Sequence, residues 1–147
     1  MKFISGSYDY NTGISTVVIQ HLGIKFTGRA YLHPDDKENV SSFAGCRYAE
    51  TRAMIKALKY ERMIAKNKAD MAIDLLKSCQ CYKNFNAEDA TAKVLYRQVN
   101  RRIKKVNELT DEINNLIKSI DKGIFARDIT LKGIKRRKDL KSKLDNK

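Results

Sequence analysis

The residues between Gly45 and Gly123 include neither glycine nor proline, and Pro34 is the only proline in the chain. These two residue types interrupt helices most strongly, because glycine loses the most backbone entropy and proline lacks an N–H group. So long an uninterrupted stretch predicts long helices through the middle of the chain. With 147 residues in all, we expect a single domain with one modest core.

Apolar residues recur along one face of the first predicted helix, which runs from near Phe43 or Gly45 to about Ser78. A break at 79–86 follows, and Asn86 is a suitable N-cap for a second helix that ends near Lys122. Glu88 and Asp89 are expected in its first turn. Its apolar positions alternate in steps of three and four, which is typical of a coiled-coil-like seam: Val99, Ile103, Val106, Thr110, Ile113, Ile117, Ile120 and Ile124. We therefore expect a helical hairpin.

The first third of the chain predicts strands. Residues 14–22 and 24–33 are rich in β-branched and aromatic residues, with Gly23 between them, and apolar and polar residues alternate through the second run. A further strand over 3–10 is set off by the turn sequence at 11–13. The fold class is therefore α+β, with a small N-terminal antiparallel sheet followed by a long helical hairpin.

The predicted organisation is one α+β domain over 1–127, with the sheet in 1–33 and helices in 35–124. Asp35 is a suitable N-cap for a short helix after Pro34, with Glu38 three residues later. Residues 128–147 form a basic segment that is expected to be either a third helix or a tail.

Positive charge dominates the chain, which has a formal net charge of +13. Residues 93–147 hold 17 Lys and Arg against 7 Asp and Glu, so the second half carries most of the excess. Such a balance favours nucleic acids, anionic membranes or phosphorylated small molecules as partners. No apolar run is long enough to span a bilayer, and no basic-then-apolar leader is apparent, so we expect a soluble cytoplasmic protein without a membrane partner.

Catalytic and metal-binding motifs are missing from the sequence. It has no Gly-rich phosphate loop, no GxSxG and no HExxH pattern, and Cys79 and Cys81 are closer than the usual metal spacing. His33 lies near Asp35 and Asp36, which would suit a general base, but a histidine before proline is more often simply exposed. We expect a protein that is not an enzyme and needs no cofactor or metal.

Arg47 and Arg52 are the first candidate ligand-binding residues, because cations near a helix start oppose the helix dipole. Arg47 has Glu50 three residues away, so a local ion pair is at least as good an interpretation. Arg52 has only Tyr48 and Lys56 at four residues' distance, so it must stack on Tyr48, reach a distant carboxylate or meet an anion. Gly45 would allow a phosphate to approach the helix backbone closely.

The break between the helices supplies a second set of candidates. Phe85 and Asn86 lie in the break, and Arg97 and Arg101 follow on the next helix in one stripe with Lys104 and Lys105. An aromatic ring can stack on a base while guanidinium groups bind its phosphates. The alternative is that Phe85 closes the end of the hairpin and the arginines are solvated.

Residues 24–61 resemble the Thoeris anti-defence family, small phage proteins that act as cyclic-ADP-ribose sponges. The resemblance covers about a quarter of the chain: a strand ending in FTG-x-A, then HP-[DE]-D-K, then a helix start with G-C-x-x-AE-x-RA. The matching residues are Phe26, Thr27, Gly28, Ala30, His33, Pro34, Asp36, Lys37, Gly45, Ala49, Glu50, Arg52 and Ala53.

The resemblance implies a homo-oligomer in the host cytoplasm that captures glycocyclic ADP-ribose between protomers without degrading it, and that also takes up cyclic oligonucleotides. Adenine stacking and arginine clamps on the diphosphate are the expected interactions. Phe85, Arg97 and Arg101 lie outside the matched segment, so their assignment depends on residue chemistry alone. The principal alternative is an accessory protein that binds DNA or RNA through the helical stripe and the basic tail, and an interaction protein that inhibits a host enzyme is a third possibility.

Overall fold

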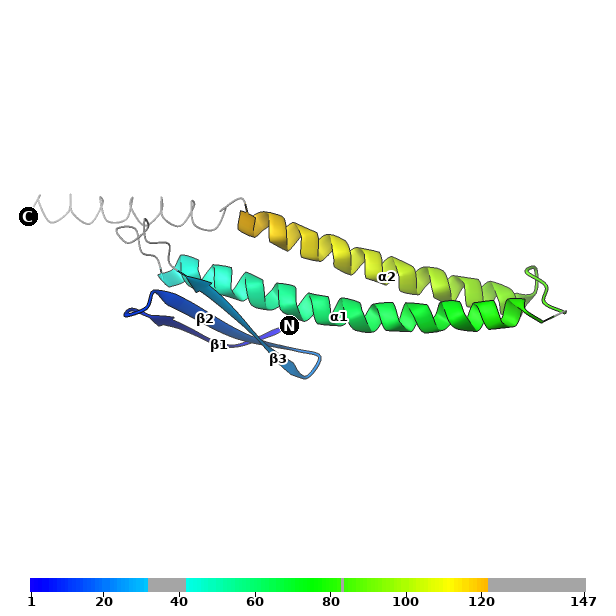
Figure 1. Cartoon of the computed structure of the whole chain (residues 1–147), viewed down its shortest axis with the longest axis horizontal. Helices are drawn as coiled ribbons and strands as arrows, with labels where there is room; N and C mark the ends of the chain where they lie inside the picture. The colour runs from blue at the N-terminus through cyan, green and yellow to red at the C-terminus, as the bar shows by residue number, and fades with distance from the viewer. Residues whose placement is uncertain (32–41, 83, 122–147) are drawn as a thin grey trace, which may run out of the picture. The chain divides into compact units, whose positions relative to one another are not determined.

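A computed structural model describes residues 1–31, 42–82 and 84–121. Three strands, β1 (Lys2–Asp9), β2 (Ile14–His21) and β3 (Ile24–Tyr31), precede two helices, α1 (Ser42–Gln80) and α2 (Ala90–Asp121) (Figure 1). The expected α+β fold, with a small antiparallel sheet followed by a helical hairpin, is therefore confirmed. The chain divides into two compact units, one containing Met1–Ala57 and the residues from Asn115 onward, the other Leu58–Asn114.

The sheet is an antiparallel meander with β2 in its centre. Leu22 and Gly23 join β2 to β3 with φ angles of 51° and 78°, as a two-residue type I′ turn requires. The β1–β2 turn is closed by Asp9, whose carbonyl accepts from Gly13 N–H at 2.8 Å and whose carboxylate accepts from Asn11 N–H at 2.9 Å. The backbone N–H of Asn11 is the main reason that the pKa of the Asp9 carboxyl lies below its usual value. Both predicted turns are confirmed.

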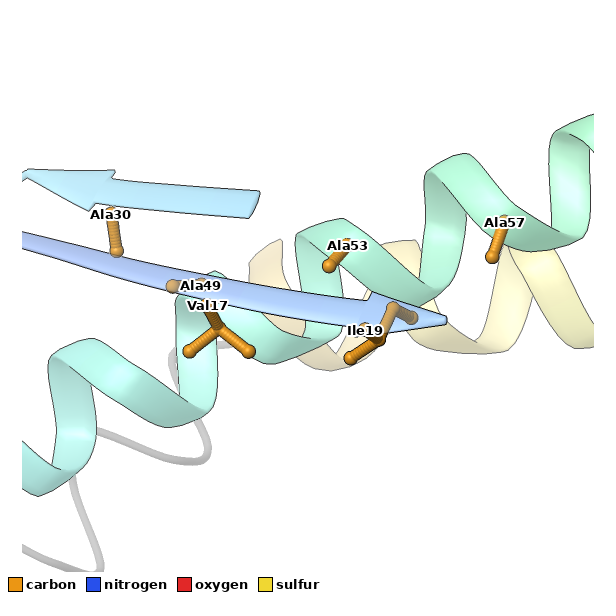
Figure 2. Close-up of a cluster of buried hydrophobic side chains, with 6 residues drawn as sticks. All are labelled: Val17, Ile19, Ala30, Ala49, Ala53 and Ala57. Atoms are coloured by element: carbon orange, nitrogen blue, oxygen red, sulfur yellow. The ribbon is translucent and has the colours of Figure 1, made fainter. Parts of the chain in front are cut away.

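Small residues let α1 pack closely on one face of the sheet. Figure 2 shows Val17 and Ile19 of β2 and Ala30 of β3 with three alanines of α1, and all six are buried: Val17, Ile19, Ala30, Ala49, Ala53 and Ala57. A Cβ atom on Gly28 would overlap the Ala49 carbonyl oxygen and lie 2.6 Å from the Ala53 backbone nitrogen. The helix backbone therefore rests directly on β3, and only glycine fits beneath it.

The same face carries a polar group without a partner. The side chain of Ser15 is 1% exposed, and within the described ranges its hydroxyl forms no hydrogen bond. It lies against Gly45 of α1, where a Cβ atom would collide with the hydroxyl oxygen. A buried hydroxyl without a partner reduces stability because it loses its hydrogen bonds to water.

Replacing Ser15 with alanine is expected to raise the free energy of unfolding by about 1 kcal/mol, because the unpaired hydroxyl is removed and the Cβ atom is kept. Urea unfolding followed by circular dichroism measures the change. Ser5→Ala on the exposed strand β1 is the matched control and should leave the unfolding midpoint unchanged. A lower midpoint for Ser15→Ala would mean that the hydroxyl has a partner.

The second unit is a helical hairpin made by the later part of α1 and the earlier part of α2. Half-buried and buried residues of α2 recur in steps of three and four at Ala92, Leu95, Val99, Arg102, Val106, Leu109 and Ile113. Three positions of the predicted seam, Val99, Val106 and Ile113, belong to this series. The placement of Ile103 in the seam is wrong, since that side chain is 39% exposed. Arg102 takes the seam position instead: it is half-buried, and its guanidinium donates to the Lys68 carbonyl at 3.4 Å.

The start of α2 also differs from the expectation. The helix begins at Ala90, so Glu88 and Asp89 precede the first turn and do not lie within it. Asn86 caps a separate turn, with its side-chain oxygen accepting from Glu88 N–H at 3.0 Å. Lys93 N–H donates to the Asp89 carbonyl, which makes Asp89 the residue at the N-cap position. The predicted ends near Ser78 and Lys122 agree with the observed ends at Gln80 and Asp121.

Several expectations concern residues outside the described ranges. They are the end of the third strand at 32–33, the short helix after Pro34, the neighbourhood of His33, Asp35 and Asp36, the helix stop at Gly123 and the basic segment 128–147.

Candidate anion-binding cleft

The outer edge of β3 supplies the backbone of the candidate site. In a two-residue hairpin the flanking pair, His21 and Ile24, exchanges hydrogen bonds, and bonded and non-bonded pairs then alternate along the strands. Thr27 and Arg29 therefore belong to non-bonded pairs, and their N–H and C=O groups point away from β2. Because β3 is the last strand of the described sheet, these groups face outward.

Two cations of α1 reach across to this edge. The Arg52 guanidinium donates to the Arg29 carbonyl at 2.6 Å, and the Lys56 ammonium donates to the Thr27 carbonyl at 2.6 Å. Arg52 and Lys56 lie one helical turn apart on α1, and the two carbonyls that they bind lie one two-residue repeat apart on β3. Each cation retains further N–H donors, because a guanidinium has five and an ammonium three.

Together these elements form an open cleft of about 490 Å³ beside β3. Its lining consists of Thr27, Arg29 and Tyr31 from β3 and Arg52 and Lys56 from α1. Three of these side chains are cationic, one is a hydroxyl and one is a phenol that is 66% exposed. No carboxylate belongs to the lining so far as the described residues extend. The cleft is thus suited to an anion with an attached ring.

Arg52 was expected to stack on Tyr48, reach a carboxylate or meet an anion, and the structure gives it a backbone carbonyl. The helix-dipole reasoning behind this candidate is wrong. Because α1 begins at Ser42, Arg52 lies in the third turn and Arg47 in the second, beyond the first turn where the dipole acts most strongly.

Arg47 forms the local ion pair that its spacing allows. Its guanidinium lies 3.2 Å from the Glu50 carboxylate, and the two side chains are about half and one third exposed. An exposed pair of this kind contributes little to stability. Gly45 also has a structural explanation, because its missing Cβ atom makes room for Ser15 and not for a phosphate.

The second set of candidates does not form a closed site. Phe85 is half-buried, and its N–H donates to the Tyr82 carbonyl at 3.0 Å. In the part of the chain that the structure describes, no arginine stacks on Phe85. Arg97 and Arg101 are exposed on α2 and form no ion pair with any described residue, whereas Lys105 pairs with Glu61 at 3.3 Å and Lys104 approaches Glu108 at 3.9 Å.

Four lining residues of the cleft were missed from the sequence: Thr27, Arg29, Tyr31 and Lys56. The polar positions of the alternating strand pattern identify the first three as one row, and Lys56 follows Arg52 by one helical turn. What the sequence lacks is a signal that this row and this helix face meet at one strand edge.

Comparison of the chain with protein-family models, with curated proteins and with solved structures gave no match. Over the described ranges, no helix has both the length and the apolar content needed to cross a membrane. Among the same residues, no three His, Cys, Asp or Glu side chains are grouped so that they could hold a metal ion.

Proposed function

We propose that this protein binds a small phosphate-bearing nucleotide in the cleft beside β3 and sequesters it without cleaving it. The observation that carries this proposal is the lining itself, with three cations, a hydroxyl and an exposed tyrosine from β3 and α1. Arginine and lysine bind phosphate oxygens through charge-assisted hydrogen bonds, and an exposed aromatic ring stacks on a base. The outward-facing N–H groups of Thr27 and Arg29 add neutral donors beside these charges.

The proposed ligand is glycocyclic ADP-ribose, the signal implied by the resemblance of residues 24–61 to Thoeris anti-defence sponges. A diphosphate flanked by an adenine suits a lining that combines clustered cations with one ring. The protein would act in the host-cell cytoplasm as a homo-oligomer. Sequestration rather than cleavage is favoured because the described lining offers donors for binding but no carboxylate, imidazole or thiol as a general base.

Capture and release of the ligand tests this function. Purified protein is mixed with glycocyclic ADP-ribose, free ligand is removed by filtration, and the protein is heated to release what it holds. Recovery of unchanged ligand in proportion to the protein is the expected result. Recovery of an altered product would show hydrolysis and refute sequestration, and absence of capture would refute the proposed ligand.

A second candidate function is binding of DNA or RNA along α2. The specific observation is that Arg97 and Arg101, four residues apart on the same helix face, are exposed and have no ion-pair partner among the described residues. Such side chains are available to successive phosphates of a nucleic-acid backbone.

Salt dependence separates the two functions. A nucleic acid held by several phosphates loses affinity steeply as salt rises, because each contact releases counterions. Between about 50 and 200 mM salt, oligonucleotide affinity should fall by about a hundredfold or more if α2 and the basic segment bind it. Fluorescence anisotropy with a labelled oligonucleotide measures the slope. A flat response, or no binding at the lower salt, would rule out the second function.

A further inference from the structure

The two edges of the sheet differ in how they are protected. At β3, Arg52 and Lys56 occupy the outward carbonyls of Arg29 and Thr27, which leaves these two carbonyls unavailable to an added strand. The outer edge of β1 has no such cover from the described elements, and apart from Tyr8 every residue of β1 is exposed. Phe3 is 56% exposed at the start of this strand. An unprotected edge of eight residues is a template for pairing with another strand.

We propose that β1 pairs antiparallel with β1 of a second copy, across a twofold axis at Gly6, to give a continuous six-stranded sheet. The proposal concerns assembly and does not depend on which ligand the cleft binds. An isologous contact of this kind requires a self-complementary strand, in which the residue at one end matches the residue at the other.

The sequence of β1, KFISGSYD, has this property. With Gly6 on the axis, Lys2 faces the partner's Asp9 and Phe3 faces the partner's Tyr8. Each pairing occurs twice in the dimer. Opposite charges and aromatic pairs directly across an antiparallel ladder are the combinations that stabilise it.

The side chains that this register pairs lie on the same face of the sheet. Lys2 pairs with Gln20 and Asp9 pairs with Ile14, so both charged side chains lie on the face away from α1. Phe3 pairs with Ile19 and Tyr8 with Ser15, so both aromatic side chains lie on the face toward α1. Residues directly opposite one another in a sheet must share a face, and both proposed pairs meet this condition.

The irregularity in β1 makes this agreement possible. The register with β2 shifts between Phe3 and Ser5, which leaves Ile4 as an extra residue. In the proposed pairing, Ile4 and Ser5 together face the partner's Ser7, as two residues face one in a β-bulge. If all eight residues of β1 paired regularly, Lys2 would lie four residues before Gly6 and Asp9 three residues after it. Lys2 and the partner's Asp9 would then lie on opposite faces, because a one-residue slip moves every side chain to the other face.

Charge variants of the full chain test the interface. Lys2→Glu places a like-charge pair at both ends of the ladder and should weaken self-association about tenfold, as measured by sedimentation equilibrium. Adding Asp9→Asn removes the repulsion and should restore most of the affinity, since an asparagine oxygen can still accept from Asn11 N–H. Circular dichroism should be the same for all three proteins. A monomeric parent chain, or a dissociation constant that Lys2→Glu leaves unchanged, would overturn the proposal.

Crosslinking tests the position of the axis independently of charge. In a chain whose three cysteines are replaced by serine, only a residue on the axis meets its own copy. Gly6→Cys should therefore form a covalent dimer under mild oxidation, and its added atoms displace only the Phe3 ring, 3.1 Å from the Cβ position. Asn11→Cys, in the β1–β2 turn, is the matched control and should remain monomeric on a non-reducing gel. Equal crosslinking of both variants, or of neither, would refute an axis at Gly6.

Discussion

Replacing Gly28 with alanine is expected to lower the free energy of unfolding by about 3 kcal/mol or more, the upper end of what overpacking costs. The added Cβ atom would overlap the Ala49 carbonyl oxygen and lie 2.6 Å from the Ala53 nitrogen. These are backbone atoms of a helix, so no side-chain rotation relieves the contact. To accept the methyl group, α1 must move off the sheet, which exposes Val17 and Ala30 of the core. Urea unfolding at low protein concentration measures the loss.

Gly6→Ala is the matched control for this variant, because both glycines lie within strands. At Gly6 the nearest atoms to an added Cβ belong to the Phe3 ring, 3.1 and 3.6 Å away, and an exposed ring can turn aside. The expected loss is therefore below about 1 kcal/mol, the usual scale for a tolerated change in a strand. If Gly28→Ala costs no more than Gly6→Ala, the close packing of α1 on β3 is wrong.

The strands and turns could be predicted because their signals are local. Alternation along 24–33, glycine at 23 and the turn sequence at 11–13 each depend on neighbouring residues only. The close approach at Gly28 is different. Its place in the apolar row was evident, but the need for glycine comes from Ala49 and Ala53, which lie more than twenty residues away in the sequence.

The candidate site likewise combines features with a local sequence signal and features that depend on residues far apart in the sequence. Arg52 was identified because its helical neighbours include no acid, and the structure does place it in the cleft. Its partner could not be inferred, since a backbone carbonyl carries no residue-type signal and Arg29 is 23 positions away. Arg47 became a candidate through its position near the helix start, and the structure shows the alternative ion pair that its three-residue spacing from Glu50 predicts. Spacing identifies which cations have local partners, and the fold determines where the remaining ones meet.

Within residues 24–61, two groups of described positions have different roles in the structure. The first group makes the close contact between helix and sheet, which requires small residues: Gly28, Ala30, Gly45, Ala49 and Ala53. The other group, Thr27 and Arg52, lines the cleft. The small residues thus bring α1 against β3, and this close approach is what allows Arg52 and Lys56 to reach the strand edge. The proposed ligand cleft is therefore a consequence of the packing.

Reversing the charge of Arg29 is expected to weaken binding of glycocyclic ADP-ribose by about a hundredfold or more. A charge-assisted hydrogen bond to phosphate contributes about 1.5–3 kcal/mol, and a carboxylate in its place adds repulsion. Arg29 is the most informative position, because its side chain forms no hydrogen bond or ion pair with the described residues, and only its backbone carbonyl binds Arg52. The fold should therefore survive Arg29→Glu, whereas changes at Arg52 or Lys56 also remove a contact to β3. Isothermal titration calorimetry measures the affinity.

Arg101→Glu makes the same change in charge on the exposed face of α2 and is the matched control. If the cleft beside β3 holds the ligand, this variant should change the affinity by less than about threefold, because Arg101 does not line the cleft and salt screens the interaction of an exposed charge with the ligand. Circular dichroism should be unchanged for both proteins. The opposite pattern, with Arg101→Glu abolishing capture and Arg29→Glu retaining it, would place the ligand at α2 beside Arg97. Equal losses in both would indicate general attraction of an anion to a basic protein, and the cleft would then have no specific role.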